Sequence, residues 1–270
     1  MIVSTAATVM ALGLSTDVQF ASPDFDRWNY GFNNTPGSRS VGSTFSAYQS
    51  GYPFDDRDGQ VLIGFITGSQ VDSGYPASAY RVASCSLTIA IASDDLPYDP
   101  TLDSVASFDP NGNGDEDAGR PTLLNGVGFR NGWDGWSFGE DGNFGEVMGA
   151  GVRNAYPFDF DQDGLARDIS NNLTDNFDPV PWGIGYIDGV VPGEIIPAYS
   201  ILNFEVDVSD PDIQCYLRTA LADGLLEFMI TSLHPASKPG SGGESNYPDW
   251  VLKENPLVDL GVTTPAGMLL

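Results

Sequence analysis

Residues 81–91 read RVASCSLTIAI and show the clearest alternation of apolar and polar side chains in the chain. Cys85, Leu87, Ile89 and Ile91 fall on one side of this segment, and small hydroxyl side chains fall on the other. Because successive side chains of a β-strand point to opposite faces of its sheet, this spacing predicts a strand with one face against a core. Cys85 is expected to lie in that core.

Other segments carry the same signal. The chain has 32 glycines and 19 prolines among 270 residues, a composition that favours many short strands joined by turns over long helices. The predicted fold class is therefore all-β, a jelly-roll-type β-sandwich with long loops rich in aspartate and glycine. Its further strands are expected at residues 24–32 (DFDRWNYGF), 61–67 (VLIGFIT), 201–208 (ILNFEVDV) and 225–233 (LLEFMITSL).

One short helix is expected directly after residues 201–208. Ser209 or Asp210 can accept hydrogen bonds from the first free amides, and Pro211 suits the first helical position. An apolar stripe follows, and Gly224 is placed to end the helix.

The chain divides into an apolar N-terminal segment, residues 1–14, and a single sandwich domain, residues 15–270, with a loop-rich insertion around residues 93–178. Residues 2–14 (IVSTAATVMALGL) resemble the hydrophobic part of a secretory signal but lack its basic start. The segment is either such a signal or a retained strand that pairs with a neighbouring subunit. Both alternatives place the protein outside the cell or on its surface, and the segment is too short to span a membrane.

The charge is strongly one-sided, with 37 acidic and 11 basic residues and a net charge of −26. Binding to nucleic acid needs clustered lysine and arginine to neutralise phosphates, so nucleic acid is excluded as a partner. Such a surface either stays solvated or binds cations.

The sequence Asp159-Phe-Asp161-Gln-Asp163-Gly164 matches the first half of a calcium-binding loop. Ca²⁺ takes six to eight oxygen ligands, and alternate residues of a tight turn can bring their carboxylates to one point. The twelfth position is Ser170 instead of the usual acid, and Asp168 is the candidate substitute. The alternative is an aspartate- and glycine-rich turn without an ion.

A second calcium candidate lies in the sequence DPNGNGDED, residues 109–117. Here Asp109, Asn111, Asn113 and Asp115 again place oxygen side chains at alternate positions. Asparagine and aspartate also favour turns for their own sake, so an ordinary turn is the competing interpretation.

Two cysteines, Cys85 and Cys215, make a zinc or iron–sulfur site untenable. They either form one disulfide, as an oxidising compartment allows, or remain two small buried thiols.

The sequence contains no recognisable nucleophile, nucleotide-binding or triad motif around its single histidine, His234, so we expect a protein without catalytic activity. A glycoside hydrolase or lyase is the enzymatic alternative, because two carboxylates suffice for that chemistry. Trp133 and Trp136 offer a different alternative, a carbohydrate-binding site on which sugar rings stack, unless both rings anchor loops or fill the core.

In chain order, the segments DFDRWNY, VLIGFIT, RVASCSLTIAI, ILNFEVDVSDP and GLLEFMITS resemble the DNRLRE-type jelly-roll modules of bacterial secreted and cell-surface proteins. Those modules are similar to carbohydrate-binding modules. The resemblance covers both ends of the chain, about half of it, and implies a surface, adhesive or polysaccharide-associated protein, often with calcium. It transfers no individual ligand residue.

These observations together predict a non-catalytic extracellular structural or surface protein that is stabilised by Ca²⁺. We expect it to self-associate, as a homo-oligomer, a filament or a surface layer. A polysaccharide is the alternative partner.

Overall fold

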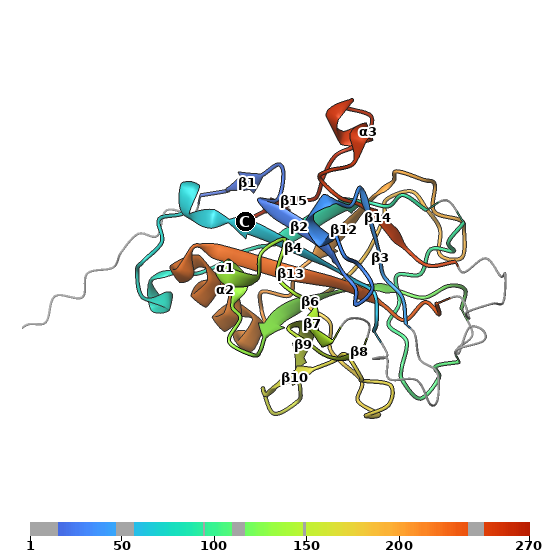
Figure 1. Cartoon of the computed structure of the whole chain (residues 1–270), viewed down its shortest axis with the longest axis horizontal. Coiled ribbons are helices and arrows are strands. Elements are labelled where there is room, and N and C mark those ends of the chain that lie inside the picture. Colours follow the sequence, from blue (N-terminus) through green and yellow to red (C-terminus); the bar gives the residue numbers. More distant parts are fainter. Residues whose placement is uncertain (1–15, 47–56, 94, 110–116, 148–149, 237–245) are drawn as a thin grey trace, which may run out of the picture.

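The computed structural model of the chain describes residues 16–46, 57–93, 95–109, 117–147, 150–236 and 246–270 (Figure 1). The apolar segment 1–14 lies outside the described residues, so its two interpretations both remain predictions.

Two antiparallel sheets form a sandwich, as the alternating segments predicted (Figure 1). The larger sheet contains, in spatial order, β10 (Ala166–Asp168), β9 (Ala155–Phe160), β6 (Thr122–Phe129), β13 (Leu225–Ser232), β4 (Gln60–Ile66) and β2 (Phe25–Asn29), with β11 (Gly183–Ile184) also paired to β6. The smaller sheet contains β1 (Gln19–Phe20), β15 (Gly267–Leu269), β5 (Ser86–Ala90) and β12 (Ile201–Glu205). Two-stranded sheets join β3 (Val41–Ser43) to β14 (Asp249–Val251) and β7 (Gly145–Val147) to β8 (Ala150–Arg153). The predicted all-β sandwich is confirmed.

The main core fills the space between the two sheets. The inward side chains of β5 and β12 are the ones that the alternation selected, and Cys85 is buried beside them. Trp182 stands at one end of this core, where its ring lies 4.7 Å from Tyr216 and 5.5 Å from Phe158. Burial of such apolar area contributes about 25 cal/mol per Å², which makes this core the main source of stability.

The larger sheet is also covered on its outer face. A second apolar cluster, which includes Leu62, Val127, Phe138 and Met229, lies there. Because β4 and β13 are buried on both faces, their sequences are almost continuously apolar instead of alternating. The pairs Arg27–Leu62 and Met229–Asn125 show that buried polar side chains share this outer face with the apolar ones.

The one long helix, α2 (Pro211–Asp223), begins and ends where the sequence predicted. The carboxylate of Asp210 accepts hydrogen bonds from the amides of Asp212 and Ile213, and Gly224 ends the helix with φ of 87°. Its buried stripe joins the main core and contacts β13. The remaining helices are single turns: α1 (Gly135–Phe138), α3 (Pro256–Asp259), and 3₁₀ turns at Pro36–Ser38, Thr67–Ser69 and Ala77–Ala79.

The region predicted as a loop-rich insertion, around residues 93–178, supplies the strands β6, β9 and β10 of the larger sheet. Its apolar segment at residues 122–129 is central, because β6 pairs with both β13 and β9. The same region also contains α1 and the pair of β7 and β8.

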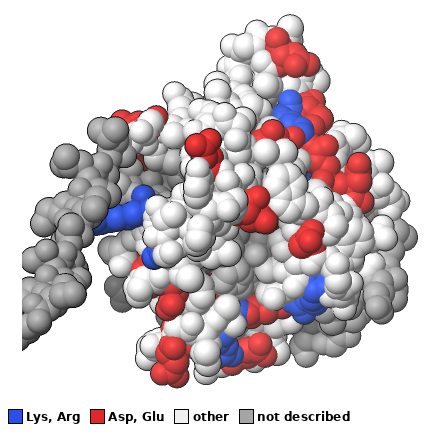
Figure 2. All heavy atoms as spheres, turned by 90° about the vertical axis from the view of Figure 1, so that its left-hand side faces the viewer, with Lys and Arg blue, Asp and Glu red and all other residues white. Residues whose placement is uncertain are grey.

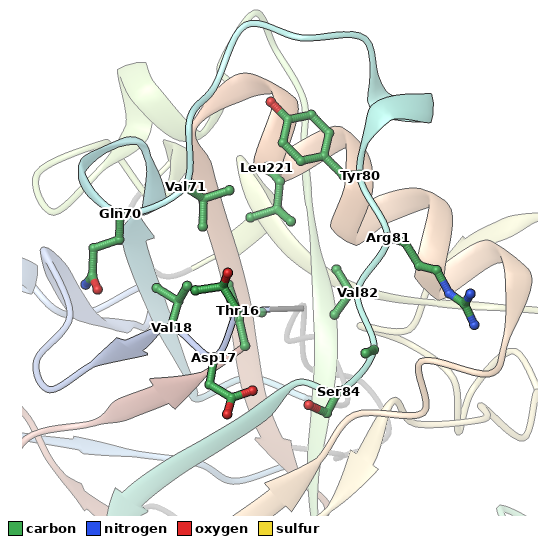
Figure 3. A pocket seen from close by; sticks show the side chains of 12 residues that line it. Thr16, Asp17, Val18, Gln70, Val71, Tyr80, Arg81, Val82, Ser84 and Leu221 are labelled. Carbon is green, nitrogen blue, oxygen red and sulfur yellow. The ribbon is translucent and has the colours of Figure 1, made fainter. Parts of the chain in front are cut away.

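A hollow of about 310 Å³ opens beside Thr16, where the described chain begins (Figure 3). Val71 and Leu221 point into it, and Arg81 points away (Figure 3). Its lining comes from the start of the domain, the segment between β4 and β5, helix α2 and Leu270.

The surface reflects the composition. On the face shown in Figure 2, acidic side chains are spread over several elements and outnumber the basic ones. Among the described residues, no helix is long and apolar enough to cross a membrane.

Candidate metal centre

Three aspartates, Asp99, Asp103 and Asp117, form the one group of potential metal ligands found among the described residues. One carboxylate oxygen of each lies within 4.8 Å of the others. Asp99 is 4% exposed, Asp103 is half-buried and Asp117 is exposed, so the group spans from the protein interior to its surface.

Main-chain contacts outside the regular sheets bring these residues together. The amide of Tyr98 donates to the carbonyl of Glu194 at 2.7 Å, which fixes the segment that carries Asp99. Gly119 lies against the same segment, since a Cβ at this position would lie 2.8 Å from the carbonyl oxygen of Pro97. Gly119 also has φ of 103°, a conformation that glycine adopts without strain. The close approach at Gly119 thus holds Asp117 near Asp99.

Thr101 and Arg120 connect the three carboxylates. The hydroxyl of Thr101 lies 2.7 Å from Oδ1 of Asp99 and 2.6 Å from Oδ2 of Asp117. The guanidinium of Arg120 lies 3.7 Å from Oδ2 of Asp103. Like charges held this close repel each other, and a cation bound among them would offset that repulsion.

The donor set selects the class of ion. All three carboxylates are hard oxygen ligands, and the hydroxyl of Thr101 adds a fourth oxygen. Oxygen sets of this kind suit Ca²⁺ or Mg²⁺, whereas zinc and copper sites use histidine or cysteine. The residues present therefore fit a hard divalent cation.

His234 lies behind this group, in a small cavity of about 10 Å³ that Asp99 and Arg120 also line. Burial, with a smaller effect of the guanidinium of Arg120, lowers the pKa of its imidazole to about 3. The ring is therefore neutral at pH 7, and its Nδ1 has no hydrogen-bond partner among the described residues.

The second predicted calcium loop borders this centre. Asp109 and Asp117 are the described ends of that loop, and Arg120 donates a hydrogen bond to the carbonyl of Asp109. Asn111, Asn113 and Asp115 lie outside the described residues. Calcium binding in this stretch stays a prediction, and the structure adds Asp99 and Asp103, which no local spacing in the sequence singled out.

The first predicted loop has a different arrangement. Asp159 belongs to β9 and is fully buried on the outer face of the larger sheet, where Nδ2 of Asn125 donates to its Oδ2 at 2.8 Å. Burial raises the pKa of Asp159 well above its usual value. Oδ1 of Asp161 accepts the amides of Asp163 and Leu165, which closes the turn between β9 and β10.

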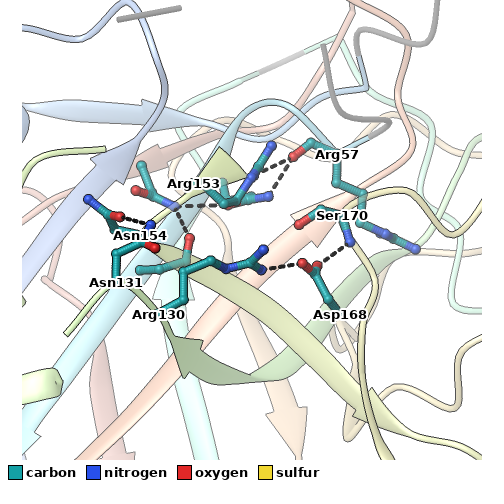
Figure 4. A network of polar contacts seen from close by, with 10 residues as sticks. Arg57, Arg130, Asn131, Arg153, Asn154, Asp168 and Ser170 are labelled. Carbon is teal, nitrogen blue, oxygen red and sulfur yellow. Dashed lines mark hydrogen bonds and ion pairs between the residues drawn. The ribbon is translucent and has the colours of Figure 1, made fainter. Parts of the chain in front are cut away.

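Asp168 is used in another way (Figure 4). Its carboxylate pairs with the guanidinium of Arg130 and accepts the amide of Ser170 at 2.8 Å. Within the described part of the chain, Asp159, Asp161, Asp163 and Asp168 do not meet as a ligand group. Calcium binding at this motif stays a prediction.

The two candidate sugar-binding tryptophans differ in their surroundings. Trp133 packs edge-on against Phe138, with the ring centres 5.7 Å apart. Trp136 is 52% exposed, and its indole nitrogen donates to Asp223 at 2.7 Å. Of the two tryptophans, only Trp136 has an exposed ring on which a sugar could stack. Carbohydrate binding stays a prediction.

Both cysteines are free thiols in the structure. Cys85 is buried as expected, whereas Cys215 is exposed on α2, so the alternative of two buried thiols is wrong for Cys215. Burial raises the pKa of the Cys85 thiol to about 12, with a smaller contribution from Glu205.

No protein-family model matches the chain, and no curated protein matches it in sequence. The resemblance to DNRLRE-type modules therefore stays a prediction.

Proposed function

We propose that this protein is a non-catalytic extracellular structural protein in which Ca²⁺ fixes the loops at one end of the β-sandwich. The observation that supports the proposal is the group formed by Asp99, Asp103 and Asp117. It connects the segment that follows β5 to the segment that precedes β6, two parts of the chain that no regular strand pairing joins directly.

Binding of Ca²⁺ to the native state alone stabilises that state by mass action. At a Ca²⁺ concentration about 100 times the dissociation constant, the gain is about 2.7 kcal/mol. We therefore expect the melting temperature of the purified protein to rise with added CaCl₂ and to fall in EDTA.

Two matched variants decide between the two candidate sites. Asp117→Asn removes one carboxylate charge from the proposed centre and should abolish most of the calcium-dependent shift. Asp163→Asn removes an exposed carboxylate from the β9–β10 turn and should leave the shift intact. If Asp163→Asn abolishes the shift and Asp117→Asn does not, the ion binds at the β9–β10 turn instead. If EDTA leaves the melting curve of the wild-type protein unchanged, calcium stabilisation is refuted.

Self-association is the second part of the proposal. Strand β1 is two residues long and ends the smaller sheet, and a strand at a sheet edge offers unpaired main-chain groups to another chain. The hollow beside Thr16 adds a partly apolar surface next to this edge. We propose that residues 1–14 of one copy occupy this edge and hollow in the next copy.

Light scattering after size-exclusion chromatography tests the assembly. The chain with residues 1–14 should form oligomers or filaments with Ca²⁺, and a chain beginning at Ser15 should remain a monomer. Val71→Asp places a charge in the hollow and should also prevent assembly without removing the segment. A full-length protein that stays monomeric at high concentration with Ca²⁺ would refute this part alone, because the melting experiment tests the ion separately.

A further inference from the structure

Arg27 is a buried cation on the outer face of the larger sheet. It is 1% exposed, and its guanidinium carbon lies 4.3 Å from the ring centre of Phe138. The hydrogen bonds that it makes to described residues both come from Nη1, to the carbonyls of Gly142 at 2.8 Å and Gly139 at 3.4 Å. Nε has no hydrogen-bond partner among the described residues.

This arrangement is uncommon because buried charges in proteins are normally paired with an opposite charge. No carboxylate of the described residues forms an ion pair with Arg27. Burial lowers the pKa of Arg27 to about 10, and the charge of Asp141 opposes that effect without a direct contact. The guanidinium remains charged at neutral pH.

A cavity of about 400 Å³ opens onto Arg27. Its walls are two loops, residues 31–36 and 141–145, which contribute the exposed amides of Asn34 and Asn143 and the ring of Phe144. Asp141 is exposed and lines the same cavity. A volume of this size is within the range of small-molecule sites.

The contacts of Arg27 indicate which ligand atoms would meet it. With Nη1 held by carbonyl oxygens and Nε buried, Nη2 is the guanidinium nitrogen left for a carboxylate of a ligand. The amide groups and the Asp141 carboxylate of the walls are donors and acceptors suited to hydroxyl groups.

We propose that this cavity binds a small hydroxylated carboxylate, of the size of one sugar acid, with the carboxylate against Nη2 of Arg27. The ligand would supply the negative charge that the described residues do not place against this guanidinium. Its hydroxyl groups would contact the side-chain amides of Asn34 and Asn143. The site is distinct from the metal centre and from Trp133 and Trp136, which do not line this cavity.

Isothermal titration with sodium glucuronate tests the proposal, with glucose as the neutral control of the same size. We expect glucuronate to bind and glucose to bind at least about tenfold more weakly, because charge-assisted hydrogen bonds are roughly twice as strong as neutral ones. Absence of glucuronate binding, or equal binding of the two sugars, would overturn the assignment.

Two variants of the cavity separate binding from folding. Arg27→Met keeps an unbranched side chain but removes the guanidinium, and it should remove glucuronate binding, provided that its melting curve shows a folded protein. Asp141→Asn removes a carboxylate that repels the ligand and should tighten binding several-fold, whether or not the arginine variant folds. Unchanged or weaker binding by Asp141→Asn would contradict the proposed position of the carboxylate.

A disaccharide with a terminal glucuronate distinguishes the source of the ligand. If the disaccharide binds as tightly as glucuronate or more tightly, we assign the end of an acidic polysaccharide as the ligand. If it binds more weakly, we assign a free sugar acid. Both results support a carboxylate site at Arg27.

Discussion

Replacing Glu227 by glutamine should stabilise the protein at alkaline pH and leave its stability near pH 5 almost unchanged. Glu227 lies on the outer face of β13 and is 6% exposed, and its Oε1 has no hydrogen-bond partner among the described residues. Gly135 of α1 covers it so closely that a Cβ there would lie 2.1 Å from Oε2. Burial first, and then the charges of Asp134 and Asp223, raise the pKa of this carboxyl from 4.5 to about 8.

The direction of the effect follows from proton linkage. Between pH 4.5 and pH 8 the native protein keeps a proton on Glu227 that the unfolded chain releases, so stability falls as the pH rises through this interval. At about 1.4 kcal/mol per pH unit, the loss amounts to roughly 5 kcal/mol at most, and relaxation of the short helix α1 would reduce it. Glutamine has the same shape and no charge, so it removes this loss.

Urea denaturation at pH 5 and pH 8.5 measures the effect in the wild-type protein, in Glu227→Gln and in Glu205→Gln. Glu205 is exposed on β12 and controls for the removal of one negative charge. We expect Glu227→Gln to lose much less stability than the wild type between the two pH values and Glu205→Gln to behave as the wild type does. An equal pH dependence in all three proteins would refute the reasoning.

Three further outcomes are expected. The pKa of His234 is about 3 in the folded protein against 6.5 ordinarily, so the unfolded chain takes up a proton that the folded protein does not. The melting temperature should therefore fall as the pH falls from 6.5 to 4. In His234→Asn this fall should be smaller in melting curves recorded from pH 7 to pH 4. A thiol reagent should label Cys215 in the native protein and Cys85 only after denaturation, whereas no native labelling would indicate a disulfide. Gly64→Ala should destabilise the protein by about 1–3 kcal/mol in urea titrations, because the new Cβ would lie 2.2 Å from the ring of Phe25; a change within about 0.5 kcal/mol would contradict this contact.

Local patterns predicted helix α2 and five of the strands, β2, β4, β5, β12 and β13. Helix α2 was predictable because a cap, a proline, an apolar stripe and a terminal glycine all lie within residues 209–224. Strand β5 covers Ser86–Ala90, less than the predicted residues 81–91, and it was predictable because only one of its faces meets the core, which gives alternating apolar and polar residues. The continuous apolar run of residues 61–67 predicted a central strand, and its two covered faces explain that composition.

The aspartate motifs show where local patterns were insufficient. The spacing of Asp159, Asp161 and Asp163 suits a calcium loop, but a loop forms only where the chain leaves the sheet. Asp159 is the last residue but one of β9, pairs with Arg167 of β10, and accepts a hydrogen bond from the side chain of Asn125 in β6. Asn125 lies 34 residues before Asp159, so the motif itself does not contain this partner.

The sequence by itself determined the elements whose signals lie within a few residues: the strands β2, β4, β5, β12 and β13, helix α2 and the acidic character of the chain. Only the tertiary structure decided which polar groups meet. Asp99, Asp103 and Asp117 come together because Gly119 packs against Pro97, and Arg27 faces a cavity because the loop of residues 138–145 folds over the sheet. Contacts between distant segments depend on how the whole chain packs, and no periodicity within one segment records them.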